Sequence, residues 1–209
     1  MKNKKMITII LKKLKELYPE KIKQRDPYKV LIETILSQRT KDENTKKASK
    51  KLFSKYDTIE KIANAQEKDL EKLIKCVGFY RVKAKRIKKI SKILINKYDG
   101  KVPKNLKELL KLPGVGRKTA NCVLVYGFNE DAIPVDTHVH RVANRIGLVN
   151  TKTPEETEKT LRKIIPRDYW KEVNKLFVEF GKNICKPTNP KHEKCPIKKF
   201  CKYVENLEV

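Results

Sequence analysis

Apolar residues recur at helical spacing along most of this chain, and the alternating pattern of strands is nearly absent. The first amphipathic face comprises Ile7, Ile10, Leu11, Leu14, Leu17 and Tyr18. Further helices are predicted near 43–55, 58–64, 67–76, 80–98, 105–112, 117–126 and 169–184, with another that begins at Asp136. The pattern therefore predicts an all-α protein.

Capping residues mark where two more helices begin. Asp26 precedes Pro27, which is typical of an N-cap followed by proline at the first helical position, and this helix is predicted to run to about Gln38. Thr153, followed by Pro154 and by Glu156 three residues later, forms a capping box. Because the links between predicted helices are short, we expect the helices to pack as compact bundles.

The last segment, 185–203, has little periodicity and carries three of the five cysteines, Cys185, Cys195 and Cys201. No apolar run is long enough to span a membrane or to form a signal peptide, which predicts a cytoplasmic protein. In that compartment clustered cysteines indicate a metal or iron–sulfur centre rather than disulfides. A segment with so little apolar pattern needs such a centre to order it.

The net charge of the chain indicates what kind of partner it binds. Its 209 residues include 51 Lys and Arg against 25 Asp and Glu, a formal net charge of +26. Self-repulsion of that size opposes compaction, so a polyanionic partner is expected. DNA, RNA and an anionic membrane all fit, and the alternative is a lysine-rich but merely solvated surface.

The segment 112–120 contains the most informative motif, Leu-Pro-Gly-Val-Gly-Arg-Lys-Thr-Ala. The proline ends one helix, and Gly114 and Gly116 permit a tight turn directly before the next. Backbone amides at such a turn, at the positive end of a helix, can bind a phosphate. An ordinary hairpin between two helices is the alternative interpretation.

Lys118 lies in the first turn of that second helix. The helix dipole and the neighbouring Arg117 both disfavour an ammonium group there, and an unprotonated amine is a nucleophile. The alternative role is phosphate binding. Asp136 follows an apolar stretch, where it can cap a helix, serve as a base or electrostatic partner of a nearby lysine, or do both.

The motifs at 112–120 and 135–141, followed by the cysteine loop, resemble the endonuclease III family of DNA glycosylases. Segments 36–42, 77–84 and 181–185 are similar to further motifs of that family, in the same order. The resemblance implies a helix–hairpin–helix glycosylase fold with two helical lobes and a DNA-binding cleft between them.

The resemblance also implies how the chain is divided. One lobe, a six-helix barrel at 24–130, is expected to contain the helix–hairpin–helix motif at about 105–127. The other lobe is expected to be discontinuous, with 1–23 joined to 131–209, and to carry the cluster loop at 185–201.

Roles for individual residues follow from the same resemblance. Lys118 is expected to be the catalytic nucleophile and Asp136 its catalytic partner. Gln38 is expected to enter the gap left by an extruded base, with Phe79 or its neighbours as a wedge against the opposite strand. Further predicted DNA contacts are Gly114, Gly116, Arg117, Lys186 and Lys191.

The activity implied is base-excision repair by a bifunctional enzyme that acts on double-stranded DNA. It would remove oxidised pyrimidines such as thymine glycol and cut the strand at the abasic site by β-elimination through a lysine Schiff base. A monomer associated with the nucleoid is expected. The alternatives are a monofunctional mismatch glycosylase and a non-catalytic helix–hairpin–helix DNA-binding protein.

The cluster loop departs from the family pattern C-x6-C-x2-C-x5-C, because His192 stands at the second ligand position. The resemblance implies a 4Fe–4S cluster held by Cys185, His192, Cys195 and Cys201. Imidazole ligates iron in some iron–sulfur centres. A structural zinc site with the same four residues is an alternative, and so is a cluster reduced to three irons.

Overall fold

The computed structural model describes residues 2–19 and 21–207. All regular structure in these residues is helical, which confirms the predicted all-α class. Contacts divide the chain into two compact units, which we call the central unit, 24–129, and the terminal unit, 1–23 with 130–209. Across the described ranges, no helix is long and apolar enough to cross a membrane.

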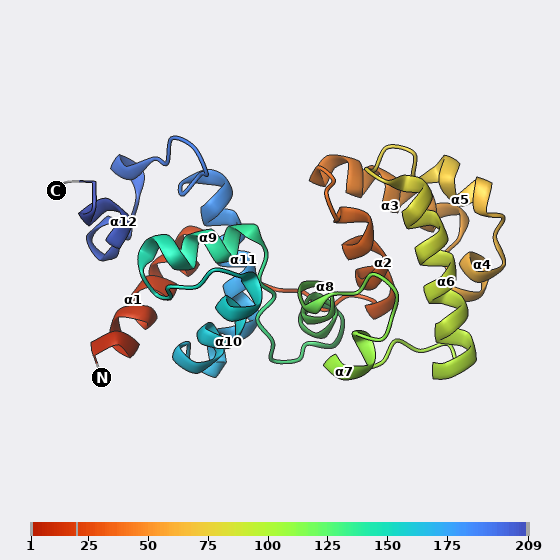
Figure 1. Ribbon diagram of the computed structural model, residues 1–209, viewed down its shortest axis with the longest axis horizontal. Helices are drawn as coiled ribbons and strands as arrows, with labels where there is room; N and C mark the ends of the chain where they lie inside the picture. Colours follow the sequence, from red (N-terminus) through yellow and green to blue (C-terminus); the bar gives the residue numbers. More distant parts are fainter. Residues whose placement is uncertain (1, 20, 208–209) are drawn as a thin grey trace. The chain divides into compact units, whose positions relative to one another are not determined.

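The central unit packs two groups of helices (Figure 1). Helices α4 and α5 lie against α6, while α2 contacts α3, α6, α8 and the π-helical segment η1. Their apolar faces supply a core in which residues such as Leu31, Ile35 and Ile87 are fully buried. The bounds are α2 (Pro27–Ser37), α3 (Asp42–Lys55), α4 (Ile59–Asn64), α5 (Glu67–Leu73), α6 (Tyr80–Tyr98), α7 (Leu106–Leu109), α8 (Arg117–Cys122) and η1 (Val123–Gly127).

The helix predicted over 117–126 widens into a π-helix in its second half. The segment that leads into α2 uses the carbonyl groups there: Arg25 N donates to Tyr126 O at 2.9 Å, and Gln24 Nε2 donates to Gly127 O at 3.1 Å. Gly127 also packs so closely on Pro27 that a Cβ atom added to Gly127 would lie 2.9 Å from the Cα atom of Pro27. Contacts with a distant segment therefore accompany the departure from an α-helix.

The terminal unit is built from both ends of the chain. Helix α1 packs on α11, and α11 packs on α9 (Figure 1). Ile10 and Leu14 of α1 share one core with Phe177 of α11 and with Ile197 of the last segment. The bounds are α1 (Lys2–Leu17), α9 (Thr137–Ile146), α10 (Pro154–Ile164), η2 (Arg167–Tyr169), α11 (Trp170–Asn183), η3 (His192–Lys194), η4 (Lys198–Phe200) and α12 (Lys202–Glu205).

The predicted helix starts are confirmed at atomic detail. Asp26 accepts a hydrogen bond from Lys29 N at 2.7 Å, and Thr153 Oγ1 accepts one from Glu156 N at 3.2 Å. Such caps satisfy amides that have no partner within the helix.

Candidate active site and metal-ligand pocket

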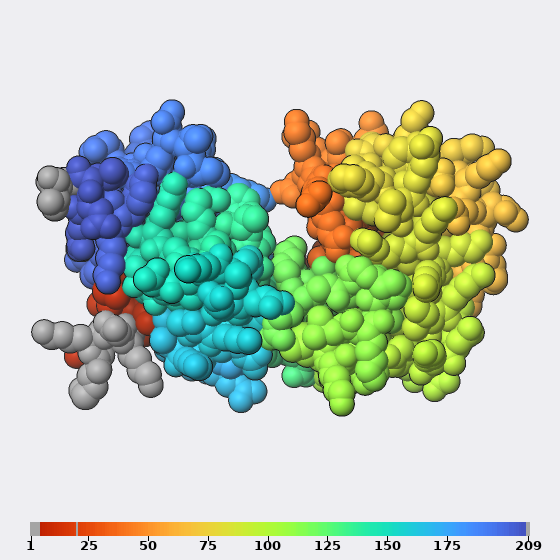
Figure 2. Space-filling view, in the orientation of Figure 1, coloured from red at the N-terminus to blue at the C-terminus, as the bar shows by residue number. Residues whose placement is uncertain are grey.

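The predicted hairpin forms between α7 and α8. Gly114 has a φ of +73°, which favours glycine, and Val115 N donates to Leu112 O at 3.1 Å to close the turn. Gly116 is the N-cap of α8 and provides no side-chain acceptor for the amides of the first turn. On the face shown in Figure 2, the green segment that contains this hairpin reaches the surface of the central unit.

Lys118 is the second residue of α8, as predicted, and directly follows Arg117, the first. Both side chains are partly buried. The structure thus places an amine in the first turn behind the hairpin. Its role as nucleophile stays a prediction, because no structural contact tests it.

Gln38 is the C-cap of α2, and its side chain makes hydrogen bonds to the hairpin. Its Nε2 donates to Gly114 O at 3.0 Å and lies 3.4 Å from Thr119 Oγ1. Arg86 of α6 donates from Nη1 to Gln38 Oε1 at 3.1 Å. Both ends of the amide are thus engaged within the central unit, so the predicted entry of Gln38 into DNA would require these bonds to be exchanged.

Phe79 lies on a turn next to the one that carries Gln38. Its side chain is 62% exposed, its φ is +57°, and the guanidinium of Arg39 lies 5.9 Å from the centre of its ring. Gly78 N donates to Thr40 Oγ1 at 3.1 Å, and a Cβ on Gly78 would be 2.8 Å from Arg39 O. The structure therefore joins the turns 38–40 and 77–80, which the sequence presented as separate motifs.

Lys83 has a structural position that sequence reasoning did not identify. It is 2% exposed, and its Nζ donates to Leu36 O at 2.7 Å, to Gln38 O at 2.6 Å and to Thr40 Oγ1 at 2.9 Å. Burial, with a smaller contribution from Arg86, lowers the pKa of Lys83 to about 8. The signal available in the sequence was a lysine in helical register with the apolar face of α6.

Asp136 is the N-cap of α9 in the terminal unit. Its Oδ1 accepts hydrogen bonds from His138 N and Val139 N, both at 2.9 Å. The predicted capping role is therefore present. Lys118 belongs to the central unit, so partnership between the two residues remains a prediction.

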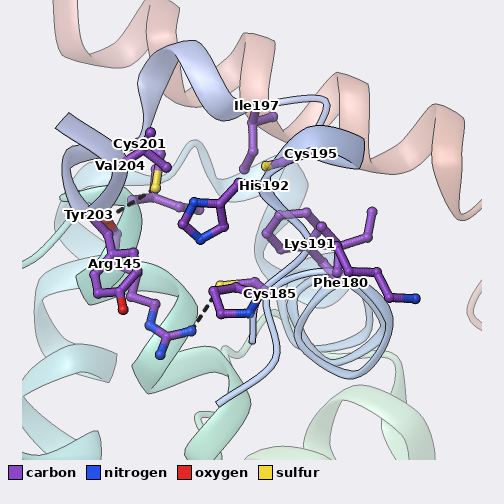
Figure 3. A pocket seen from close by; sticks show the side chains of 13 residues that line it. Arg145, Phe180, Cys185, Lys191, His192, Cys195, Ile197, Cys201, Tyr203 and Val204 are labelled. Atoms are coloured by element: carbon purple, nitrogen blue, oxygen red, sulfur yellow. Dashed lines mark hydrogen bonds between the residues drawn. The ribbon is translucent and has the colours of Figure 1, made fainter. Parts of the chain in front are cut away.

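The four predicted metal ligands line one pocket of the terminal unit (Figure 3). The imidazole of His192 points into this pocket, with the sulfur atoms of the three cysteines around it in that view. Apolar side chains provide much of the wall, namely Ile146, Phe180, Ile184, Ile197 and Val204.

Two arginines of α9 hold the loop that carries these ligands. Arg145 Nη1 donates to Lys186 O at 2.6 Å and lies 3.8 Å from Cys185 Sγ, with its guanidinium 4.6 Å from the ring of Tyr203. Arg141 Nη2 donates to Cys185 O at 3.0 Å. Basic side chains thus face the beginning of the loop.

The donor set of this pocket fits a metal centre. Three thiols and an imidazole share it, and these are donor types that hold structural zinc and iron–sulfur centres. Within the part of the chain that the structure describes, no three His, Cys, Asp or Glu side chains are already arranged around one metal position. The four donors therefore line the same pocket, but their side chains would have to move closer together to bind one metal centre.

The remaining predicted DNA contacts lie in the same loop. Lys186 is partly buried, and its carbonyl oxygen accepts the hydrogen bond from Arg145. Lys191 is exposed, and its backbone N–H donates to Ile184 O at 3.0 Å. Neither observation tests contact with DNA.

Comparison with known proteins matches residues 32–167 to the HhH-GPD superfamily of base excision DNA repair proteins. The chain is 55% identical over 198 residues to endonuclease III of Thermotoga maritima, covering 95% of this chain and 93% of that protein. A structure described as a trapped endonuclease III–DNA covalent intermediate is 38% identical, with a TM-score of 0.90 over 99% of both chains. A thermostable thymine-DNA glycosylase is 32% identical, with a TM-score of 0.86 over 98% of both.

The chain therefore belongs to the HhH-GPD superfamily of base excision DNA repair proteins. Within it, the chain is similar to endonuclease III over nearly its whole length, which confirms the resemblance drawn from the motifs. At the level of the family, the predicted DNA glycosylase and AP lyase class is confirmed as well.

Proposed function

We propose that this protein removes oxidised pyrimidines from double-stranded DNA and cuts the strand at the resulting abasic site, with Lys118 as the nucleophile. The observation that carries the proposal is the position of Lys118 in the first turn of α8, directly behind the glycine hairpin. A relative that is 38% identical was solved as a trapped covalent intermediate with DNA, which supports a covalent route.

The hairpin would hold the DNA strand during the reaction. Because Gly116 offers no side-chain acceptor to the first-turn amides, a phosphate oxygen can supply one. The positive end of the helix dipole adds to the attraction. Arg117 at the start of α8 contributes a further positive charge beside that phosphate.

The chemistry begins with extrusion of the damaged base, because a base inside the stack is out of reach. The unprotonated amine of Lys118 attacks C1′ of the sugar, and the base departs with the electron pair of the glycosidic bond. Opening of the sugar ring gives a Schiff base that acidifies the C2′ proton. Removal of that proton expels the 3′ phosphate, and water then releases Lys118 by hydrolysis.

Asp136 would serve this reaction as a carboxylate. It takes the proton of the Lys118 ammonium group or stabilises positive charge that develops on the sugar. Both capping bonds end on Oδ1, so the cap of α9 does not require the second oxygen of Asp136. Capping and catalysis are therefore compatible in one side chain.

The proposal is tested with duplexes that contain thymine glycol, other oxidised pyrimidines, mismatched thymine or an abasic site. The wild-type protein is expected to release oxidised pyrimidines and to nick the strand without heat or alkali. Borohydride is expected to trap a covalent complex with DNA through Lys118.

Two other functions give different results in the same assay. A mismatch glycosylase, which the similarity to a thymine-DNA glycosylase supports, would release thymine and leave the strand intact until alkali is added. A DNA-binding protein without catalysis would release no base and give no trapped complex.

For the ligand pocket we propose a 4Fe–4S cluster held by Cys185, His192, Cys195 and Cys201. The four donors share one pocket and keep the spacing of the family pattern, from which only the residue type at His192 departs. When bound, the cluster would supply structural cross-links to the loop. Lys186 and Lys191 of the ordered loop would then contact phosphate. Iron, sulfide and zinc analysis with a visible spectrum distinguishes this cluster from a structural zinc site or a three-iron cluster.

The last part of the proposal concerns the oligomeric state of the protein and where it acts. We propose a monomer that acts inside the cell on nucleoid DNA, and the net charge of +26 supports a polyanionic partner. Sedimentation without DNA measures the oligomeric state. The salt dependence of duplex binding should be steep, because counterions are released from the DNA.

A further inference from the structure

The turn that carries Gln38 has a backbone conformation that its own residues disfavour. Helix α2 ends at Ser37, and Gln38 leaves the helical region with a ψ of 119°. The next residue, Arg39, has a φ of +50°, where residues other than glycine are uncommon. Surrounding contacts must therefore hold this turn in place.

The ammonium group of Lys83 supplies three of these contacts. Its three N–H groups match three acceptors: Leu36 O in the last turn of α2, Gln38 O and Thr40 Oγ1. The negative end of the α2 dipole favours a cation at this position. Thr40 Oγ1 in turn accepts from Gly78 N, so the same network reaches the turn that carries Phe79.

We propose that Lys83 is a positioning residue for base extrusion, an inference that rests on the function proposed above. It fixes the backbone of the turn 38–40, which Thr40 links to the turn 77–80, so that Gln38 meets the duplex in a defined geometry. Lys83 is 2% exposed and its three donors are engaged, so it acts through Gln38 and does not touch the DNA.

Replacement of Lys83 by methionine tests the proposal, because Lys83→Met keeps an unbranched chain and removes the charge and all three donors. The matched control is Lys85→Met on the same helix, whose exposed amine only approaches Glu67 at 3.7 Å. For each protein we would measure thermal unfolding, binding to a duplex with a stable abasic analogue, and single-turnover release of thymine glycol. Fluorescence of 2-aminopurine beside the lesion reports extrusion directly.

Lys83→Met is expected to slow extrusion and base release by about tenfold to a hundredfold, the loss that hydrogen bonds from a charged donor produce. Lys85→Met is expected to behave like wild type. The decisive measurement is the same substitution in a Gln38→Ala background. There Lys83→Met should slow base release by less than about threefold, because residues that act through one another are not additive.

Each outcome bears on the inference. Unchanged extrusion in a folded Lys83→Met protein overturns it, and so does an equal loss with and without Gln38, which would indicate a purely structural role. If Lys83→Met does not fold, Thr40→Val removes one acceptor and is expected to slow extrusion in the same direction, again only while Gln38 is present. A wild-type protein that releases no base overturns the proposed function and this inference together.

Discussion

The guanidinium of Arg86 lies where a Cβ atom on Gly114 would have to be, since that atom would come within 2.3 Å of Arg86 Nε. Gly114 also has a φ of +73°. Gly116 differs on both counts: its φ is −89°, and nothing lies within 4 Å of an added Cβ. The backbone conformation therefore favours glycine at the first position, where the Arg86 side chain also occupies the space of a Cβ atom, whereas the second glycine leaves open space at the start of α8.

Substitution of the two glycines should consequently have different effects, on stability at Gly114 and on DNA binding at Gly116. Gly114→Ala is expected to destabilise the protein by about 1–3 kcal/mol, because alanine disfavours the positive φ at this position and the Arg86 side chain would have to move. Gly116→Ala should change stability by less than about 1 kcal/mol, yet weaken duplex binding by about tenfold because a methyl group obstructs the phosphate. Thermal unfolding and fluorescence anisotropy measure the two effects. Wild-type affinity in Gly116→Ala would argue against a phosphate at this hairpin.

Removal of the amine at Lys118 should abolish the covalent step. Lys118→Gln is expected to lose borohydride trapping on abasic duplex and to slow base release by about a thousandfold or more. Lys107→Gln, which changes an exposed lysine of α7, is the control and should trap like wild type. If Lys118→Gln still forms the cross-link, another amine is the nucleophile.

Substitutions at Asp136 separate its two roles. Asn caps helices about as well as Asp, so Asp136→Asn should keep stability within about 0.5 kcal/mol while base release slows by about a hundredfold or more. Asp136→Ala loses both capping bonds and should also cost about 1–2 kcal/mol. Denaturant unfolding and single-turnover kinetics provide the two measurements. Full activity in Asp136→Asn would leave the residue with a capping role alone.

Much of the fold could be predicted because its signals are local. Helical periodicity, the caps at Asp26 and Thr153 and the turn at Gly114 each depend on a few neighbouring residues, and the structure confirms them. The candidate residues Lys118 and Asp136 were found the same way, as first-turn and cap positions.

The parts that could not be predicted depend on contacts between distant segments. Lys83 was a member of a motif in the sequence, but its bonds to residues 36–40 exist only once α6 packs on α2. The π-helical turn at 123–127 likewise accompanies contacts with residues 24–27. The four metal donors could be predicted from their spacing in the sequence. Their apolar pocket, in contrast, arises from packing of α9, α11 and the final segment.

Variants at His192 test whether it is a ligand. His192→Cys restores the four-cysteine pattern and should retain four irons per chain with stronger resistance to iron loss. His192→Ala should lower the iron content and destabilise the terminal unit, because metal binding and folding are coupled. Iron analysis and thermal unfolding are the measurements. Equal metal content in wild type and His192→Ala would remove the histidine from the ligand set.

The last prediction concerns alkaline pH and again involves Lys83. Its pKa in the folded protein is about 8, below the value of about 10.4 expected when unfolded. Below both values the amine is protonated in either state, whereas between them the unfolded chain binds more protons. Stability is therefore expected to rise with pH across this window through this group.

In Lys83→Met this contribution is absent, so the stability difference between wild type and variant should shift in favour of wild type as the pH rises from about 8 to about 10.4. Urea unfolding of both proteins at a series of pH values measures that difference. The other lysines are the same in both proteins, so their contributions to the difference cancel. Parallel curves would mean that Lys83 keeps its proton over the whole range, because three hydrogen bonds to the ammonium group offset the cost of burial.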